Sequence, residues 1–233
     1  MINDVYMIGW DEPDFEENHR RACEVLDTNV KIILGINGIH SAHKHCAEIT
    51  KSDFFWCIDG DNWLYDLAKT DMVEVETTAE TNSVYVMRAK NPFNGLIYGH
   101  GAMKLFPTNS FLTNIDQSSV DMTSGVNLYY KIIHRLTSEH RYNASAFHTW
   151  RTAFRECVKL SSSIIKNQNQ KETDDRLRVW CNSENGKNIR WYNENHHGAI
   201  TGAKWGNENY NTNKIGIIND FNKLEELFRS CYN

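Results

Sequence analysis

The residues best suited to chemistry are two aspartates that follow directly on an apolar run. Residues 54–58 (FFWCI) have the length and composition of a buried strand, and Asp59-Gly60-Asp61 comes immediately after them. Side chains two residues apart on a strand point to the same face, so both carboxylates can approach one hard cation directly or through water. Mg²⁺ or Mn²⁺ held by so few carboxylates completes its shell with water and substrate phosphates. The pattern predicts a divalent-metal site for a phosphorylated donor, with a polar turn that caps the next helix as the structural alternative.

Two other acidic motifs place carboxylates in a similar segment. A calcium-binding EF-hand loop that starts at Asp59 needs glycine at its sixth position and glutamate at its twelfth, where this chain has Leu64 and Thr70. The EF-hand is thereby excluded. Phosphohydrolases that form an aspartyl-phosphate also carry two aspartates after an apolar strand, but their pattern continues with Thr or Val where this chain has Trp63. They also place the pair on the first strand, so they remain a secondary alternative.

Short apolar runs and helical stripes alternate along the first 58 residues. We expect strands at 5–8, 30–34 and 54–58, with helices over 15–26 and 41–50 between them. Such alternation, with uninterrupted apolar strands, predicts an α/β fold with a mostly parallel central sheet flanked by helices. In these sheets ligands bind beyond the carboxyl ends of the strands, which is where Asp59 lies.

The pattern changes after residue 70. Alternating polar and apolar residues at 72–76 and 83–87 predict half-exposed strands, and 96–98 leads into a glycine turn, so we expect a small mixed or antiparallel section here. The segment 166–214, rich in Asn, Lys and Gly, is expected to be loop with short strands. Apolar residues at helical spacing predict helices over three later segments: 124–137, 148–165 and 218–231.

Length and composition favour one cytoplasmic domain. A chain of 233 residues with 40% hydrophobic and 24% charged residues can bury a sizeable core. The N-terminus has an acidic residue where a signal peptide carries basic ones, and no apolar run approaches the roughly 20 residues that span a bilayer. A net charge of −5 argues against a general nucleic-acid binder, although residues 141–190 hold 10 basic residues against 5 acidic ones.

Three histidines lie close together in the predicted helix after the second strand. They are His40, His43 and His45, at positions i, i+3 and i+5. This spacing does not bring three imidazoles onto one ion, so we expect surface and packing roles for them.

The chain resembles nucleotide-sugar glycosyltransferases of the GT-A fold in the order of its elements and in the motif Ile58-Asp59-Gly60-Asp61-Asn62. The D-x-D of those enzymes binds Mn²⁺ or Mg²⁺ and the donor diphosphate. A second segment, Asn91-Pro-Phe-Asn-Gly-Leu-Ile-Tyr-Gly-His-Gly-Ala-Met-Lys-Leu-Phe-Pro107, resembles a block that some phage-encoded members carry after the metal strand. Those members add glucose or arabinose from a UDP-sugar to 5-hydroxymethylcytosine in phage DNA. The resemblance covers residues 1–165.

The resemblance implies a single GT-A-like catalytic domain over 1–233 in the host cytoplasm. Residues 1–69 would form the nucleotide and metal half, 70–165 the acceptor side, and 166–233 C-terminal loops and a helix. Asp59 and Asp61 would bind the metal, with His197 as the late histidine ligand that GT-A enzymes often use, unless it is an exposed loop residue. The residues implied to bind the nucleotide sugar are Asp11, Asn37, Asp59, Gly60, Tyr98, Gly99 and Gly101, with tight turns as the alternative role of the last two glycines.

Lys104 and Asp121 are the candidate catalytic residues. The resemblance implies that Lys104 faces the donor phosphate or the acceptor, and a solvated position in a first helical turn is the alternative. An inverting enzyme needs a carboxylate near the acceptor hydroxyl, and Asp121, just before a predicted helix, is the best-placed free acid. Capping that helix is its alternative role. Retention or inversion stays open.

Basic residues of the predicted 148–165 helix suggest the acceptor. Arg151, Arg155 and Lys159 recur at i, i+4 and i+8 opposite its apolar stripe, and Arg176 and Arg178 follow. We expect these five residues to bind DNA phosphates, with a solvated helix face as the alternative. Three tryptophans, Trp150, Trp180 and Trp191, are either core residues or stacking platforms for an extruded base.

The partners expected from these observations are a UDP-sugar and double-stranded DNA that contains hydroxymethylated cytosine, with no membrane. Two other interpretations stay open. One is a glycosyltransferase that acts on a glycan or a protein. The other is a non-enzymatic DNA- or carbohydrate-binding module in which the aspartate pair is structural.

Overall fold

A computed structural model of the chain describes residues 4–116, 118–122, 124–165, 169–210 and 212–232. Its first elements alternate as predicted: β1 (Asp4–Gly9), α1 (Phe15–Leu26), β2 (Lys31–Leu34), α2 (Ile39–Ile49) and β3 (Phe54–Asp59). α1 buries Phe15, Ala22 and Leu26 at helical spacing, whereas β1 and β3 are buried at nearly every position. Near-continuous burial is expected of strands that are covered on both faces.

The other elements of the first compact unit are β4 (Asn62–Leu64), α3 (Ala68–Thr77), β5 (Ser83–Lys90), β6 (Ile97–Tyr98), β7 (Lys104–Pro107), α4 (Thr108–Asn114) and β8 (Tyr129–His140). Within the described residues the strands form one eight-stranded sheet in the order β2-β1-β3-β7-β5-β8-β4, with β6 on β5. β1 pairs in parallel with β2 and β3, and β5 with β8, whereas the other pairs are antiparallel. The predicted α/β class, with a GT-A-like central sheet and an antiparallel section, is confirmed, and the sheet is more mixed than the first strands suggested.

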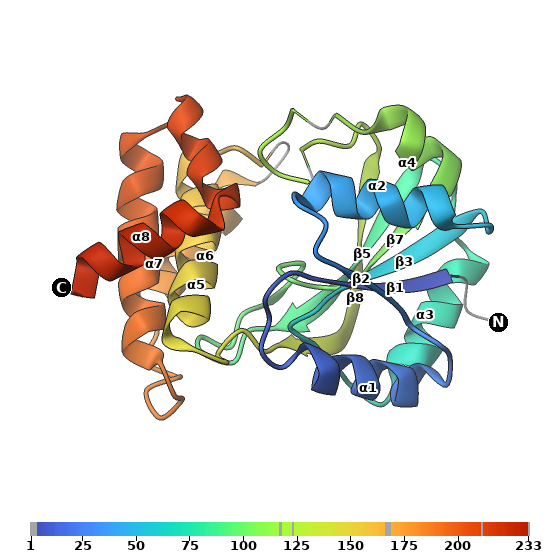
Figure 1. Cartoon of the computed structure of the whole chain (residues 1–233), viewed down its shortest axis with the longest axis horizontal. Coiled ribbons are helices and arrows are strands. Elements are labelled where there is room, and N and C mark those ends of the chain that lie inside the picture. Colours follow the sequence, from blue (N-terminus) through green and yellow to red (C-terminus); the bar gives the residue numbers. More distant parts are fainter. Residues whose placement is uncertain (1–3, 117, 123, 166–168, 211, 233) are drawn as a thin grey trace. The chain divides into compact units, whose positions relative to one another are not determined.

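Helices cover both faces of this sheet, with α1 and α3 on one face and α2 and α4 on the other (Figure 1). On the first face, Trp56 and Ile58 of β3 pack into a core with α1 and α3. On the second face, Phe55 stacks on Phe106 of β7 and meets Phe111 of α4 edge to face. Because successive strand residues point to opposite faces, Asp59 at the end of β3 belongs to the α2 side.

Two segments have a secondary structure opposite to the predicted one. Residues 72–76 were expected as a strand but belong to α3, whose buried residues Ala68, Met72 and Val75 lie at i, i+4 and i+7. Residues 124–137 were expected as a helix but lie largely in β8, which begins with Tyr129 and Tyr130 and pairs along β5. Aromatic and β-branched residues favour strands, and the cross-strand partners outweighed an apolar spacing that also fits a helix.

The second compact unit comprises Pro92–Leu96, Ser118–Ser124 and Tyr142–Asn233. Its helices are α5 (Ala146–Ser162), α6 (Gln170–Asn182), α7 (Tyr192–Glu208), the 3-10 helix η1 (Asn213–Asn219) and α8 (Phe221–Tyr232) (Figure 1). α5 and α8 confirm the helices predicted over 148–165 and 218–231, but the loop predicted over 166–214 is wrong because α6 and α7 occupy most of it. That the two units act as one catalytic domain stays a prediction. None of the helices in the described ranges is both long and apolar enough to cross a membrane.

A row of glycines lets α7 pack directly on α5. Gly198, Gly202 and Gly206 recur at i, i+4 and i+8 and face the α5 backbone. A Cβ atom at Gly202 would lie 2.3 Å from the carbonyl oxygen of Phe154, and one at Gly198 would lie 2.5 Å from that of Trp150. The glycine content that suggested a loop therefore serves close contact between two helix backbones.

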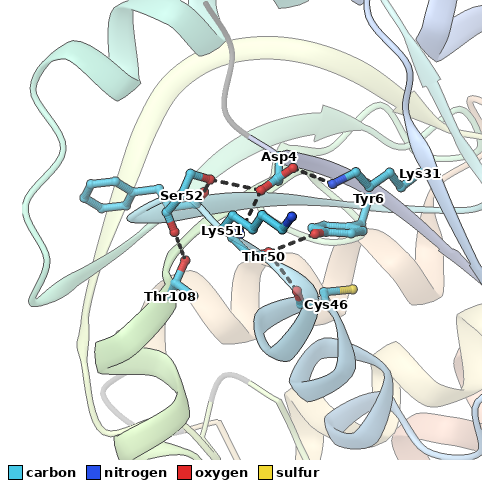
Figure 2. Close-up of polar contacts among 9 residues, drawn as sticks. Asp4, Tyr6, Lys31, Cys46, Thr50, Lys51, Ser52 and Thr108 are labelled. Atoms are coloured by element: carbon cyan, nitrogen blue, oxygen red, sulfur yellow. Dashed lines mark hydrogen bonds and ion pairs between the residues drawn. The ribbon is translucent and has the colours of Figure 1, made fainter.

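A polar network joins the starts of the first two strands (Figure 2). The Asp4 carboxylate accepts hydrogen bonds from Lys31 Nζ at 2.5 Å and from the Lys51 amide and Ser52 hydroxyl at 3.2 Å. Burial raises the pKa of Asp4, but these hydrogen bonds together outweigh it and keep the pKa below its usual value. Asp4 thereby ties β1 to β2 and to the segment before β3, at the opposite end of the strands from Asp59.

Candidate functional site

Asp59 and Asp61 flank a turn that is fixed to the end of β1. The amide of Gly60 donates to the carbonyl oxygen of Ile8 at 2.8 Å, and the carbonyl of Gly60 accepts from buried Asn18 at 2.9 Å. A Cβ atom at Gly60 would lie 2.6 Å from the ring of Phe15. Glycine is thus required here by packing against α1, and the predicted role of Gly60 in binding the nucleotide sugar stays a prediction.

Asp61 is held at its side chain by the last residue of β8 and at its backbone by the residue that follows β8. His140 Nε2 lies 2.7 Å from Asp61 Oδ2, and the Arg141 amide donates to the Asp61 carbonyl oxygen at 2.7 Å. His140 is buried, with 4% of its surface exposed. The contact follows from the antiparallel pairing of β4 with β8, in which Asn62 is opposite His140. Sequence reasoning missed His140, since nothing local to it signals a partner 79 positions away.

The turn that contains Gly99 and Gly101 lies against the same histidine. The ring of His140 meets the ring of His100 edge to face at 4.5 Å, and His100 in turn stacks on Tyr98 at 5.7 Å. Gly101 has a φ of +62°, and a Cβ there would lie 2.7 Å from the His140 ring. The predicted residues Tyr98 and Gly101 are therefore brought to the surroundings of Asp61.

Asn62, the first residue of β4 and the neighbour of Asp61, fastens this glycine turn to the strand. It is fully buried, and its amide group donates to the carbonyl oxygen of Gly101 while its side-chain oxygen accepts from the Ser138 hydroxyl at 2.7 Å. Gly99 has a packing role, because a Cβ there would lie 2.8 Å from Val86. Asn62 stood next to the D-x-D motif in the sequence, but its partners come from β8 and from the turn.

Asp59 lies in a charged neighbourhood on the α2 side of the sheet. Burial is the main cause that lowers the pKa of His43, to about 4. The positive charges of Lys104 and His40 lower this pKa further, whereas the negative charge of Asp59 raises it. His43 is therefore neutral at pH 7, and its Nδ1 donates to the Ile39 carbonyl oxygen at 2.9 Å. Lys104 Nζ donates to the Ala102 carbonyl oxygen at 3.0 Å. His40 and His43 are buried packing residues, as predicted.

The residues predicted on the nucleotide side follow the neighbouring parallel strands. Asp11 comes after β1 and Asn37 after β2, and both are exposed. β2, β1 and β3 are adjacent and parallel, with Gly9 opposite Leu34 and Ile8 opposite Asp59. Asp11, Asn37 and Asp59 therefore follow the carboxyl ends of three adjacent strands, where ligands bind in such sheets.

The oxygen donors at this edge suit a hard divalent cation. Asp59 and Asp61 are both half-buried and offer carboxylate oxygens, the ligands that Mg²⁺ and Mn²⁺ prefer. An N–H donor behind one of them, as His140 provides, is the usual support of a metal-binding carboxylate. Among the described residues no group of three or more His, Cys, Asp or Glu side chains is placed to hold a metal ion. The donor set thus fits a cation that takes further ligands from phosphate and water.

The predicted residues Asp121 and His197 belong to the second unit. Asp121 is buried and forms an ion pair with Lys159 at 2.9 Å, and it accepts from the Ser124 amide at 3.4 Å. Among the described residues the next element after Asp121 is the strand β8, not the helix that it was expected to precede. His197 lies in α7, not in a loop, with its ring edge to face against Tyr232 at 5.3 Å. The catalytic role of Asp121 and the metal role of His197 stay predictions.

The exposed basic ridge predicted on α5 is wrong. Arg151 is 4% exposed and its guanidinium lies 4.2 Å from the ring centroid of Phe221, while Arg155 Nε donates to the Ile218 carbonyl oxygen at 2.6 Å. Arg151 and Arg155 are thus covered by η1 and α8, and Lys159 pairs with Asp121, so the three cations of α5 are engaged in internal contacts. Arg176 and Arg178 lie on α6 and form ion pairs with acidic residues of the same helix. Their role in DNA binding stays a prediction.

Comparisons with known proteins find similarity among solved structures. No protein-family profile matches the sequence, and no curated protein matches it. S. aureus TarS (residues 1–349) is 7% identical, with 89% of this chain and 91% of TarS covered at a TM-score of 0.40, and it has also been solved in complex with UDP-GlcNAc. HddC from Yersinia pseudotuberculosis is 12% identical over 58% of this chain and 71% of HddC, with a TM-score of 0.37. Bifunctional IspDF from Campylobacter jejuni is 10% identical over 61% of this chain and 51% of IspDF, with a TM-score of 0.41. TM-scores below 0.5 at this identity assign neither a family nor an activity to this chain.

Proposed function

We propose that this chain is a metal-dependent glycosyltransferase that moves a sugar from a UDP-sugar to a hydroxyl acceptor in the cytoplasm. The observation that carries the proposal is the placement of Asp59 and Asp61 beyond the carboxyl end of β3, beside the ends of the parallel strands β1 and β2. This is the position at which α/β sheets bind nucleotides. Asp11 and Asn37, which follow the two neighbouring strands, are the proposed contacts to the nucleoside.

The chemistry asks for stabilisation of the departing diphosphate. Glycosyl transfer passes through an oxocarbenium-like state while negative charge develops on the leaving phosphate. A divalent cation held by Asp59 and Asp61 would neutralise part of that charge. Lys104 is the proposed protein cation near the diphosphate. It lies on the same side of the sheet as Asp59, since the charges of both residues act on His43.

Hydrolysis of the donor tests the proposal without knowledge of the acceptor. Asp61→Asn keeps the size of the side chain but removes its charge, so Mn²⁺-dependent UDP release from UDP-glucose or UDP-arabinose should fall by about 100-fold or more, since metal stabilisation of a leaving group is worth several kcal/mol. The matched control is Asp66→Asn, whose side chain is 87% exposed and pairs with Arg21. Its activity should be unchanged. Full activity in the Asp61→Asn variant would contradict the proposed metal site. No UDP release by the unmodified chain would contradict the whole proposal and favour a binding module.

The acceptor in the proposal is 5-hydroxymethylcytosine in phage DNA, with glucose or arabinose as the sugar. This acceptor is supported by the resemblance of residues 91–107 to a block of the phage-encoded glycosyltransferases. The cations of α5 do not support it, because they are engaged in contacts within the protein. Incubation of the chain with each UDP-sugar and with matched unmodified or hydroxymethylated DNA should add one hexose or pentose per hydroxymethylcytosine, read by mass spectrometry of the nucleosides. UDP-sugar hydrolysis without transfer to either DNA would instead indicate a glycan or protein acceptor.

A further inference from the structure

The contact between His140 and Asp61 has a defined direction. A carboxylate only accepts hydrogen bonds, so the proton of the 2.7 Å contact belongs to His140 Nε2, and the ring is the donor to Asp61 Oδ2. The residue that follows β8, Arg141, donates its amide to the backbone carbonyl of Asp61. The last residue of β8 and the residue after it therefore hold the side chain and the backbone of one aspartate.

His140 is itself tightly confined. Its ring is buried against the ring of His100, and the backbone of Gly101 approaches so closely that a Cβ there would lie 2.7 Å from both Cγ and Nδ1. Asn62 keeps Gly101 in this place through its hydrogen bond to the glycine carbonyl. With little room to rotate, the His140 ring presents Nε2 in one direction, toward Asp61.

We infer that His140 is a positioning residue that sets the side-chain rotamer of Asp61 for binding a divalent cation together with a nucleotide diphosphate. This inference rests on the proposed function of the Asp59–Asp61 site. A carboxylate on a turn has rotamer freedom that is lost on binding, and a buried donor at the end of a strand removes that freedom in advance. His140 acts through Asp61: its Nε2 is directed at the carboxylate, so the role is that of a hydrogen-bond donor behind the ligand.

Two substitutions distinguish the hydrogen-bond donor of His140 from the packing of its imidazole ring. His140→Gln keeps an N–H group near the position of Nε2, whereas His140→Leu removes it. The measurement is Mn²⁺ affinity in the presence of UDP, by calorimetry. In His140→Leu this affinity should weaken by about 10- to 100-fold, which is the usual effect of removing a hydrogen-bond partner behind a metal ligand. In His140→Gln it should stay within about threefold of the affinity of the unmodified chain. The matched control is His134→Leu, an exposed position on the same strand, which should leave the affinity unchanged.

A double-variant cycle distinguishes positioning from general destabilisation. If His140 acts through Asp61, His140→Leu should weaken binding no further in the Asp61→Asn background. Additive losses, or equal losses in the Gln and Leu variants, would overturn the inference. If His140→Leu does not fold, nitrogen NMR of histidine in the unmodified chain, assigned by comparison with His140→Gln, should show the proton on Nε2. A proton on Nδ1 alone would overturn the inference.

The outcomes separate this inference from the function on which it rests. The positioning role alone would be overturned if UDP-sugar turnover depends on Asp61 but Mn²⁺ affinity is unaffected by His140→Leu. The proposed glycosyltransferase function would then still stand. If the unmodified chain shows no Mn²⁺–UDP binding and no turnover, both the positioning role and the proposed function are overturned. Loss of affinity in His140→Leu, rescue in His140→Gln and no further loss in the Asp61→Asn background would support the positioning role.

Discussion

Replacing Gly202 with alanine should lower the free energy of unfolding by at least about 3 kcal/mol, because the added methyl group has no space and its neighbours are main-chain atoms. The new Cβ would lie 2.3 Å from the carbonyl oxygen of Phe154 and 2.8 Å from its Cα. A backbone inside a helix cannot move aside as a side chain can, so α7 and α5 would have to separate. Alanine is the better helix former by about 1 kcal/mol, and the clash must outweigh that gain.

Gly216→Ala is the matched control for this prediction. Gly216 lies in η1 of the same unit, its φ is not in the left-handed region, and a Cβ there would meet nothing within 4 Å. Its free energy of unfolding should change by less than about 0.5 kcal/mol. Urea unfolding followed by tryptophan fluorescence measures both variants, since Trp150 and Trp205 pack around α5 and α7. Equal stabilities of the Gly202 and Gly216 variants would show that α5 and α7 do not pack this closely.

The second large effect is a loss of stability on mild acidification that depends on His43. Burial lowers the pKa of His43 from an ordinary value of 6.5 to about 4 in the folded chain. Between these values the unfolded chain binds more protons than the folded one, so stability rises with pH and is lost as the pH falls from 6.5 toward 4. A difference of this size corresponds to about 3 kcal/mol. Below pH 4 both states are protonated and this contribution stops changing.

A variant without the titrating group isolates the effect. His43→Asn retains a donor for the Ile39 carbonyl but has no proton to gain, so the decrease in unfolding free energy between pH 7 and pH 4 should be smaller by about 3 kcal/mol than in the unmodified chain. The control is His45→Asn, a half-exposed position on the same helix, whose pH profile should follow that of the unmodified chain. Both profiles come from urea unfolding at a series of pH values. Identical profiles for the His43 variant and the unmodified chain would contradict the prediction.

Local sequence was ambiguous wherever an apolar spacing fitted two structures. In α3, Met72 and Val75 lie on one helical face, yet the alternation with glutamates also fits a strand. In β8 the apolar residues fit a helical stripe, yet pairing with β5 makes them a strand. Such segments are decided by their partners, because propensity differences between helix and strand are smaller than the energy of packing against a neighbour.

The internal contacts of the α5 arginines could not be predicted from local pattern either. A helical wheel places Arg151 and Arg155 opposite the apolar stripe, which predicts solvent exposure. The C-terminal segment supplies Phe221 and the carbonyl of Ile218, and these partners cover the same face of α5. A cation stacked on an aromatic ring and bonded to a carbonyl is stable when buried.

Two features could be predicted from local sequence alone: the alternation of strands and helices up to Asp59, and the position of Asp59 and Asp61 at the carboxyl end of a strand. Apolar runs and stripes suffice for this because burial of neighbouring residues is a local requirement. The residues that surround the two aspartates depend instead on contacts between distant parts of the chain. His140 reaches Asp61 because β8 pairs with β4, and Gly101 lies against His140 because Asn62 holds its carbonyl. These contacts join residues tens of positions apart, and pairing of distant strands, which no local spacing encodes, brings them together.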